Sequence, residues 1–200
     1  MPRVPAVRIG DRVVHGWNPQ GYAELLGVKY ELKAQLPPRE LAARLDRILE
    51  SAQTVIGRFD KAQLDIVPPE RKRTIRDLAF HVFRVGLSYI DAMDQGSLPE
   101  GWFEERAPEG MEDGGDVARW GALVRGRIAG WFEGAGPEEF ARTVEVYYGP
   151  QGSHDLLERT TWHCGQHLRQ LYVLADRLHI APGPLPTHLF KDLPIPDAIW

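Results

Sequence analysis

An all-α fold, a four-helix bundle, is what this sequence predicts, with a short N-terminal β-hairpin and helix and a proline-rich, extended C-terminal strap. Four segments repeat apolar residues at close to the 3.6-residue period of an α-helix. Prolines, glycines and capping residues separate these segments, and one connection between them is long and polar. This combination is typical of a bundle in which one long loop crosses between helices.

Residues 1–36 have short strand-like runs and a turn signal, whereas residues 37–200 have long segments with helical periodicity. Ala6–Ile9 and Arg12–His15 are short strand-like runs joined by a Gly-Asp turn signal, which predicts a hairpin. An Asn-Pro pair then predicts a short helix over 18–27. This unit is too small for a core of its own, so we expect it to pack on the main domain, 37–200.

Two long helices are predicted next. A proline pair opens the first, over 37–59, and a second proline pair separates it from the helix 74–92. Thr74 and Asp77 have the spacing of a capping box at the start of that second helix.

The second half of the chain predicts the other two helices. Residues 95–115 are rich in glycine, proline and glutamate and predict a long loop, after which Asp116 is expected to cap a helix that reaches Trp131. Residues 143–148 alternate like a strand or an extended crossing. Ser153 is then expected to cap the fourth helix, which extends to Leu178.

The last segment, 181–200, cannot form an α-helix because it contains five prolines. Its leucine, isoleucine, phenylalanine and tryptophan side chains make it more apolar than a free end. We therefore expect it to wrap the bundle as an extended strap.

Three histidines carry the functional prediction. His163 and His167 are four residues apart, so they share one face of the fourth helix, near its apolar stripe. His81 lies at the edge of the apolar stripe of the second long helix. Inward-facing imidazoles need either separate hydrogen-bond partners or a common ion. The pattern favours a shared divalent metal with three protein ligands and one open position.

Bulk properties exclude several classes. The net charge of −4 gives no electrostatic footprint for nucleic acid or an anionic membrane. No apolar run approaches the length of a membrane span, and the N-terminus lacks the apolar region of a signal peptide. The single cysteine, Cys164, excludes an internal disulfide and is expected to be a buried small hydrophobe. We expect a cytoplasmic protein.

The segments TIRDLAFH (74–81) and WHCGQHLRQL (162–171) resemble the DinB-like (YfiT-like) family of metal-dependent enzymes. The resemblance covers about 37–200 and implies a four-helix bundle, commonly a homodimer, that binds zinc or nickel through three histidines. Carried over residue by residue, the ligands are His81, His163 and His167. In many members of the family, a glycine lies two residues after the second histidine of the pair. Here Gly165 lies two residues after His163. Aligned on that glycine, the paired positions would be Arg159 and His163 instead of His163 and His167.

The N-terminal segment RVPAVRIGDRVVHGW is similar to the later half of a glutaredoxin. In that family the backbone beside a cis-proline holds a thiol ligand, and the matching residues here are Val4 and Pro5. The half of that fold that carries the redox cysteine is absent, so redox activity is not implied. A low-molecular-weight thiol is a candidate second cofactor.

The function these features predict is a thiol-dependent S-transferase acting on a small molecule. A metal-dependent hydrolase and a non-catalytic metal-binding stress or scaffold protein are the alternatives. One arginine beside the ligand turns, Arg84, Arg159 or Arg169, is a candidate for binding a substrate carboxylate.

Acidic and histidine neighbours of the site have smaller predicted roles. Asp77 and Asp91 are candidates to orient the metal ligands. His188 in the strap could reach the site if the strap folds over it. His154 and His179 are expected to be solvated.

Overall fold

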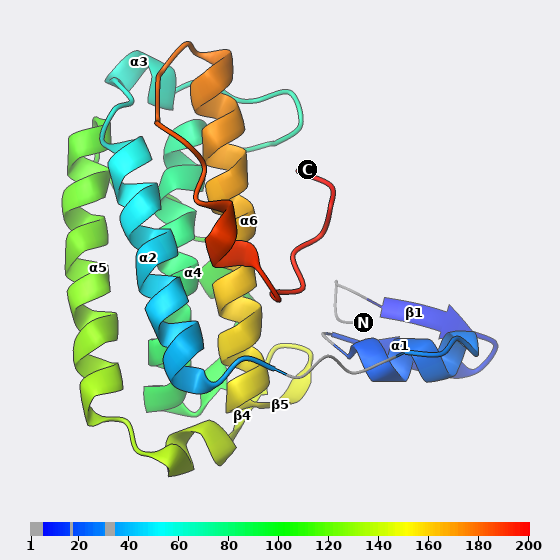
Figure 1. Ribbon diagram of the computed structural model, residues 1–200. Coiled ribbons are helices and arrows are strands. Elements are labelled where there is room, and N and C mark those ends of the chain that lie inside the picture. Colours follow the sequence, from blue (N-terminus) through cyan, green and yellow to red (C-terminus); the bar gives the residue numbers. More distant parts are fainter. Residues whose placement is uncertain (1–5, 17, 31–34) are drawn as a thin grey trace.

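The computed structural model describes residues 6–16, 18–30 and 35–200, and its main body is a bundle of four long helices (Figure 1). The helices are α2 (Pro38–Ile56), α4 (Ile75–Gln95), α5 (Gly114–Gly134) and α6 (Ser153–Arg177). The four-helix bundle predicted from the sequence is therefore confirmed.

Each of α2 and α4 packs against both α5 and α6. In Figure 1, α2 and α6 run in one direction, and α4 and α5 run in the other. The parallel pair α4 and α5 needs a long connection, which is the loop 96–113. Its end is fixed where the Gly114 amide donates to the Phe59 carbonyl, 3.1 Å away, so α5 begins where α2 ends.

Three predicted caps have different outcomes. Thr74 caps α4 by accepting from the Asp77 amide, but the Asp77 carboxylate turns away and accepts from the Ala107 amide. The helix α5 is capped by Asp113, so the prediction of Asp116 was wrong. Asp116 completes a capping box three residues later. Ser153 was also predicted wrongly, because it is the first helical residue and its hydroxyl donates to the Glu139 carbonyl.

The core lies between the four helices and is almost entirely aliphatic and aromatic. Its largest fully buried side chains include Leu41, Leu45, Ile48, Leu49, Phe83, Tyr89 and Ile90. Burying one such side chain stabilises the fold by roughly 1.5–3 kcal/mol. The helices that carry the histidines are therefore held by a continuous apolar core.

A small sheet lies at the end of the bundle where α6 begins. Its strands are β3 (Ser97–Leu98), β4 (Thr143–Val146) and β5 (Gly149–Gly152), with β3 parallel and β5 antiparallel to β4. The segment 143–148, expected to be a strand or an extended crossing, forms the strand β4 over its first four residues. Three short helices complete the connections: α3 (Lys61–Leu64), η1 (Glu100–Phe103) and η2 (Pro137–Ala141).

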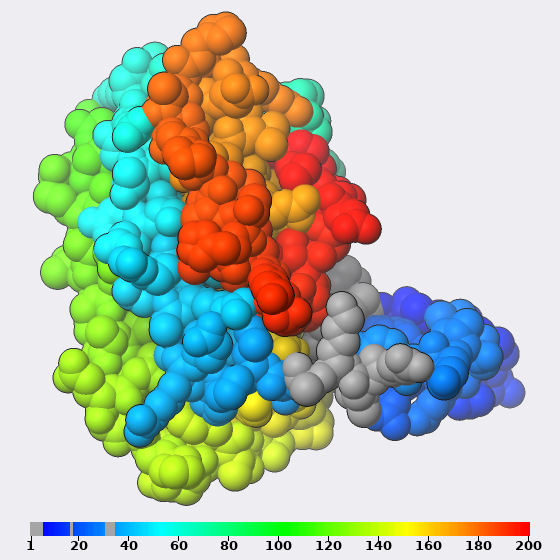
Figure 2. Space-filling view, in the orientation of Figure 1, coloured from blue at the N-terminus to red at the C-terminus, as the bar shows by residue number. Residues whose placement is uncertain are grey.

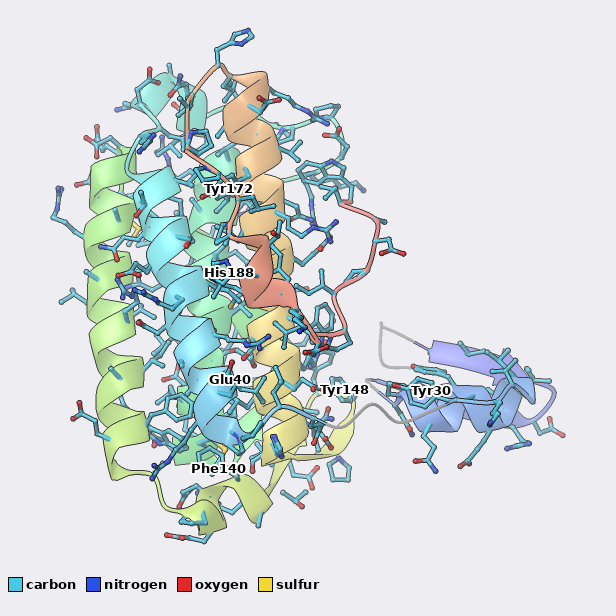
Figure 3. The ribbon with its side chains drawn as sticks, in the orientation of Figure 1. Tyr30, Glu40, Phe140, Tyr148, Tyr172 and His188 are labelled. Carbon is cyan, nitrogen blue, oxygen red and sulfur yellow. The ribbon has the colours of Figure 1, made fainter. Side chains whose placement is uncertain are left out.

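The N-terminal unit stands beside the bundle (Figure 1). It consists of the predicted hairpin, β1 (Ala6–Ile9) and β2 (Arg12–His15), and of α1 (Pro19–Leu26), which Asn18 caps. Gly16 lies directly against the ring of Tyr148, which Figure 3 places on the side of the bundle that faces this unit. Any side chain at position 16 would overlap that ring, so the approach requires glycine.

The C-terminal strap runs over the surface of α6 and contains one 3-10 turn, η3 (Thr187–Phe190), which contacts α2 and α6 (Figure 2). Arg169 fastens it by donating to the carbonyls of Pro196 and Asp197. Across the part of the chain that the structure describes, no helix combines the length and apolar character that a membrane crossing requires.

Candidate metal centre

The three histidines predicted as ligands lie together between α4 and α6. The ring centroids of His163 and His167 are 4.6 Å apart, and that of His81 is 4.9 Å from His167 and 6.0 Å from His163. One nitrogen from each ring lies within 4.8 Å of the others. A tetrahedral ion with bonds of about 2.1 Å holds its ligand atoms roughly 3.4 Å apart. Side-chain rotations that move the ring nitrogens by about 1 Å would therefore bring all three within bonding distance of one ion.

Two nitrogens of this cluster are buried without a hydrogen bond. They are Nδ1 of His81 and Nε2 of His167, on side chains whose residues are 8% and 4% exposed. A buried polar atom without a partner costs about 1–3 kcal/mol. Two such atoms in one cluster of three imidazoles indicate that a partner belongs there, and the donor set fits a divalent cation.

The other nitrogen of His167 is held in place by Gln170. Nδ1 of His167 donates to Oε1 of Gln170 over 2.8 Å, which leaves the Nε2 lone pair free for an ion. The amide of Gln170 is itself oriented, because its Nε2 donates to the Ile199 carbonyl at 2.6 Å. The strap therefore fixes the orientation of the Gln170 amide, and the amide determines which nitrogen of His167 carries the proton.

All three imidazoles are held neutral. Burial lowers the pKa of His167 to about 4, and burial followed by the neighbouring histidine charge lowers the pKa values of His81 and His163 well below 6.5. Neutral imidazole is the form that binds metal, so at pH 7 the cluster needs no deprotonation before it accepts an ion.

A cavity of about 290 Å³ opens beside the histidines. Its lining combines the three imidazoles with two arginines and three apolar residues: Pro68, Arg71, Arg73, Leu78, His81, Phe103, His163 and His167. No carboxylate is among these described lining residues. The cavity gives a small molecule access to one side of the cluster.

The three arginines that sequence analysis proposed for a substrate carboxylate are engaged elsewhere. Arg84 pairs with Glu105 and Asp91. Arg169 fastens the strap. Arg159 donates to the phenolic oxygens of two tyrosines at 2.7 and 2.9 Å. None of the three lines the cavity.

Other candidates also have structural roles. Asp77 accepts from Ala107 and Asp91 pairs with Arg84, so neither orients a histidine. Cys164 is buried against the Val82 carbonyl, and burial raises the pKa of its thiol, in keeping with the inert role expected.

The remaining histidines stay outside the cluster. His188 is exposed on η3, where Figure 3 labels it, and it is not one of the clustered histidines. His179 is exposed as expected, whereas His154 is half-buried with Nε2 2.8 Å from the Leu36 carbonyl. Val4 and Pro5 lie outside the described residues, so the thiol ligand stays a prediction, as does the homodimer.

Sequence reasoning missed six residues of the site: Gln170 and the five that line the cavity beside the histidines, Pro68, Arg71, Arg73, Leu78 and Phe103. Gln170 had a signal, because it lies three residues after His167 and so shares its helical face. The others follow from tertiary structure. Arg71 and Arg73 precede α4, and Phe103 comes from the loop that was expected to be too polar for the interior. Its ring lies 6.2 Å from those of His81 and His163.

Comparison with known proteins places this geometry in a family. The family model of the DinB superfamily matches residues 37–171. A search of curated proteins found no match. The DinB-like protein YjoA from Bacillus subtilis has a similar fold, with a TM-score of 0.57 and 15% identity over 73% of this chain and 95% of that one. YfiT from Bacillus subtilis, described as a probable metal-dependent hydrolase with an unusual four-helix bundle topology, has a TM-score of 0.55 and 14% identity over 76% and 95%.

Proposed function

This chain belongs to the DinB superfamily, and we propose that it is a metal-dependent enzyme whose divalent cation is held by His81, His163 and His167. The observation that carries the proposal is the cluster itself: one ring nitrogen from each of the three histidines lies within 4.8 Å of the others, and His81 Nδ1 and His167 Nε2 are buried without a hydrogen-bond partner. Three neutral nitrogen donors suit zinc or nickel better than magnesium or calcium, which prefer oxygen ligands.

A catalytic role is favoured over a purely structural ion. A structural zinc site is closed by four protein ligands, whereas a catalytic one has three and an open position. Here the described residues offer three ligand atoms, and a cavity adjoins them. This arrangement supports an enzyme rather than a scaffold in which an ion only joins α4 to α6.

The bound cation would act as a Lewis acid and lower the pKa of a nucleophile in the open position. The chain itself supplies the surroundings. Gln170 keeps the proton of His167 on Nδ1, so the lone pair of His167 Nε2 is free for the cation. Arg71 and Arg73 make the cavity positive, which favours an anionic nucleophile over its protonated form.

The reaction we propose for this cavity is the transfer of an organic group from a small electrophilic substrate to the sulfur of a thiol. No carboxylate among the described lining residues is placed to remove a proton. A thiol has an ordinary pKa of about 8.5, against 15.7 for water, so it needs much less help to ionise. Hydrolysis is the second candidate, and it is favoured by the likeness to YfiT, itself described as a probable metal-dependent hydrolase.

The first test is thermal stability with and without metal. Adding zinc or nickel to chelator-treated protein should raise the melting temperature by mass action, because the ion binds only the folded state. His167→Ala should abolish the increase, and the exposed control His179→Ala should keep it. Equal increases in parent and His167→Ala would refute the site.

The second test separates the reactions. Metal-loaded protein would be incubated with cysteine and 1-chloro-2,4-dinitrobenzene, and separately with p-nitrophenyl acetate without a thiol. We expect metal-dependent conjugation that is lost in His163→Ala. Ester hydrolysis without conjugation would assign the protein as a hydrolase, and neither activity in zinc-loaded protein would contradict the transferase proposal.

A further inference from the structure

Arg71 and Arg73 stand out among the arginines of this chain. Most described arginines pair with a carboxylate, but neither of these two forms an ion pair within the part of the chain that the structure describes. Both line the cavity beside the histidines. Two guanidinium groups at one small cavity repel each other unless an anion lies between them.

The two side chains are held in place through other contacts. Nη1 of Arg73 donates to the Phe103 carbonyl at 2.9 Å, which uses one of its five donors. Arg71 lies over the ring of Trp200, 5.6 Å from its centroid, and its Nε is buried without a hydrogen-bond partner. Each guanidinium therefore keeps donors free for a ligand in the cavity.

The charge balance of the cavity points in the same direction. The pKa of Arg71 is lowered by burial and by the charge of Arg73, which means that the site destabilises its own cation. The imidazoles are neutral, and no lining residue among those described is acidic. An anionic ligand would relieve this unbalanced positive charge, and it would do so both in the metal-free protein and with the proposed divalent cation bound.

From this geometry we propose that Arg71 and Arg73 bind an oxyanion group of the substrate, a carboxylate or a phosphate, so that the enzyme acts on small anionic molecules. Guanidinium forks match the two oxygens of either group. Leu78, Phe103 and Pro68 form the apolar wall for the hydrocarbon part. The substrate would be anchored at the arginines with its reactive part toward the histidines. This inference rests on the proposed function, whose site it specifies.

The size of the cavity limits the substrate. A volume of about 290 Å³ lies at the lower end of the range for ligand sites, roughly 300–1,000 Å³. A cavity of this size favours a small organic anion over a peptide, and benzoate is a suitable probe.

The test measures anion binding in both chelator-treated and zinc-loaded protein, by isothermal titration calorimetry at low ionic strength. The probes are benzoate, inorganic phosphate and the neutral analogue benzamide. We expect benzoate or phosphate to bind the metal-free parent at least tenfold more tightly than benzamide, since the arginines act without the ion. The stronger of the two anions identifies the group that the site prefers.

The variants are Arg71→Gln, Arg73→Gln and Arg73→Lys, with Arg39→Gln as control. Arg39 is exposed on α2, so its loss changes the net charge equally without touching the cavity. Each glutamine variant should weaken anion binding by about tenfold or more, because a hydrogen bond to a charged group is lost. Arg73→Lys keeps the charge without the fork and should lie between parent and Arg73→Gln. Arg39→Gln should match the parent.

The outcomes separate this inference from the metal site. Benzoate and phosphate binding no better than benzamide, or all three cavity variants binding like the parent, would overturn the inference even if zinc still binds. Arginine-dependent anion binding without any zinc binding would support the anion site and refute the proposed metal centre.

Discussion

Replacing Gln170 should weaken metal binding although Gln170 is not itself a ligand. It is 1% exposed, its Oε1 accepts from His167 Nδ1 at 2.8 Å, and its Nε2 donates to the Ile199 carbonyl. Gln170→Leu removes the acceptor. His167 can then carry its proton on Nε2 instead of Nδ1. In that tautomer Nε2 has no free lone pair and cannot bind an ion.

The expected size follows from the role of such outer partners. Loss of a group that orients a metal-binding histidine lowers metal affinity by about 10–100-fold, or about 1.4–2.7 kcal/mol. The bond here is short and nearly completely buried, so we expect the upper part of this range. Zinc affinity would be measured by competition with a chromophoric chelator.

Two variants isolate the cause. Gln170→Glu keeps an acceptor for Nδ1 while losing the donor to the strap, so it should bind zinc at least as well as Gln170→Leu and closer to the parent. Gln166→Leu breaks the equivalent bonds from Gln166 Nε2 to the Ala198 and Ile199 carbonyls, but the hydrogen bonds of Gln166 involve none of the described histidines. If Gln166→Leu weakens zinc binding as much as Gln170→Leu, the effect comes from the strap and the reasoning is refuted.

Three further predictions concern the same fold. In chelator-treated protein, His167 has a pKa of about 4 when folded and about 6.5 when unfolded, so the unfolded state binds more protons between these values. His167 alone should lower the stability by about 3 kcal/mol as pH drops from 6.5 to 4, and His81 and His163 add to this fall; urea unfolding of His167→Gln should therefore show a smaller fall, and identical slopes would contradict the burial argument. Cys164→Ala should leave activity unchanged, and a thiol reagent should label Cys164 only on unfolding, because the thiol is buried with a raised pKa; labelling of native protein would show that the thiol is accessible. Gly121→Ala should destabilise by about 1–3 kcal/mol because a methyl group there overlaps the Phe83 ring, whereas Gly126→Ala, with open space around it, should stabilise α5 by about 0.5–1 kcal/mol; equal melting temperatures would contradict both.

The bundle could be predicted because its signals are local. Apolar periodicity and the capping residue Thr74 act within a few residues of the element they specify, and the hairpin β1–β2 matched its predicted bounds. The errors were also local. Asp113 and Asp116 have the same residue type three positions apart, and only the capping geometry shows which of them precedes the helix.

The site was predictable only where helical spacing could reach. Three inward histidines on two helices follow from periodicity, and so would Gln170, which shares the face of His167. The arginines of the cavity do not follow, because Arg71 and Arg73 lie before α4 and line the cavity together with Phe103 from a separate loop, whose carbonyl accepts from Arg73. Sequence adjacency favoured Arg84 and Arg159, and both are occupied by partners from distant segments.

The strap connects these observations to function. It carries no ligand, yet its carbonyl at Ile199 fixes the Gln170 amide, and its Trp200 ring lies beneath Arg71. The histidine that offers its lone pair and the arginine that offers its donors are therefore both oriented by one extended segment. Because five prolines exclude an α-helix, this segment keeps carbonyls free for such contacts. Loosening the strap through Gln166→Leu should for this reason weaken anion binding more than zinc binding, because the acceptor of His167 Nδ1 stays in place, whereas Gln170→Leu should weaken zinc binding more than Gln166→Leu does.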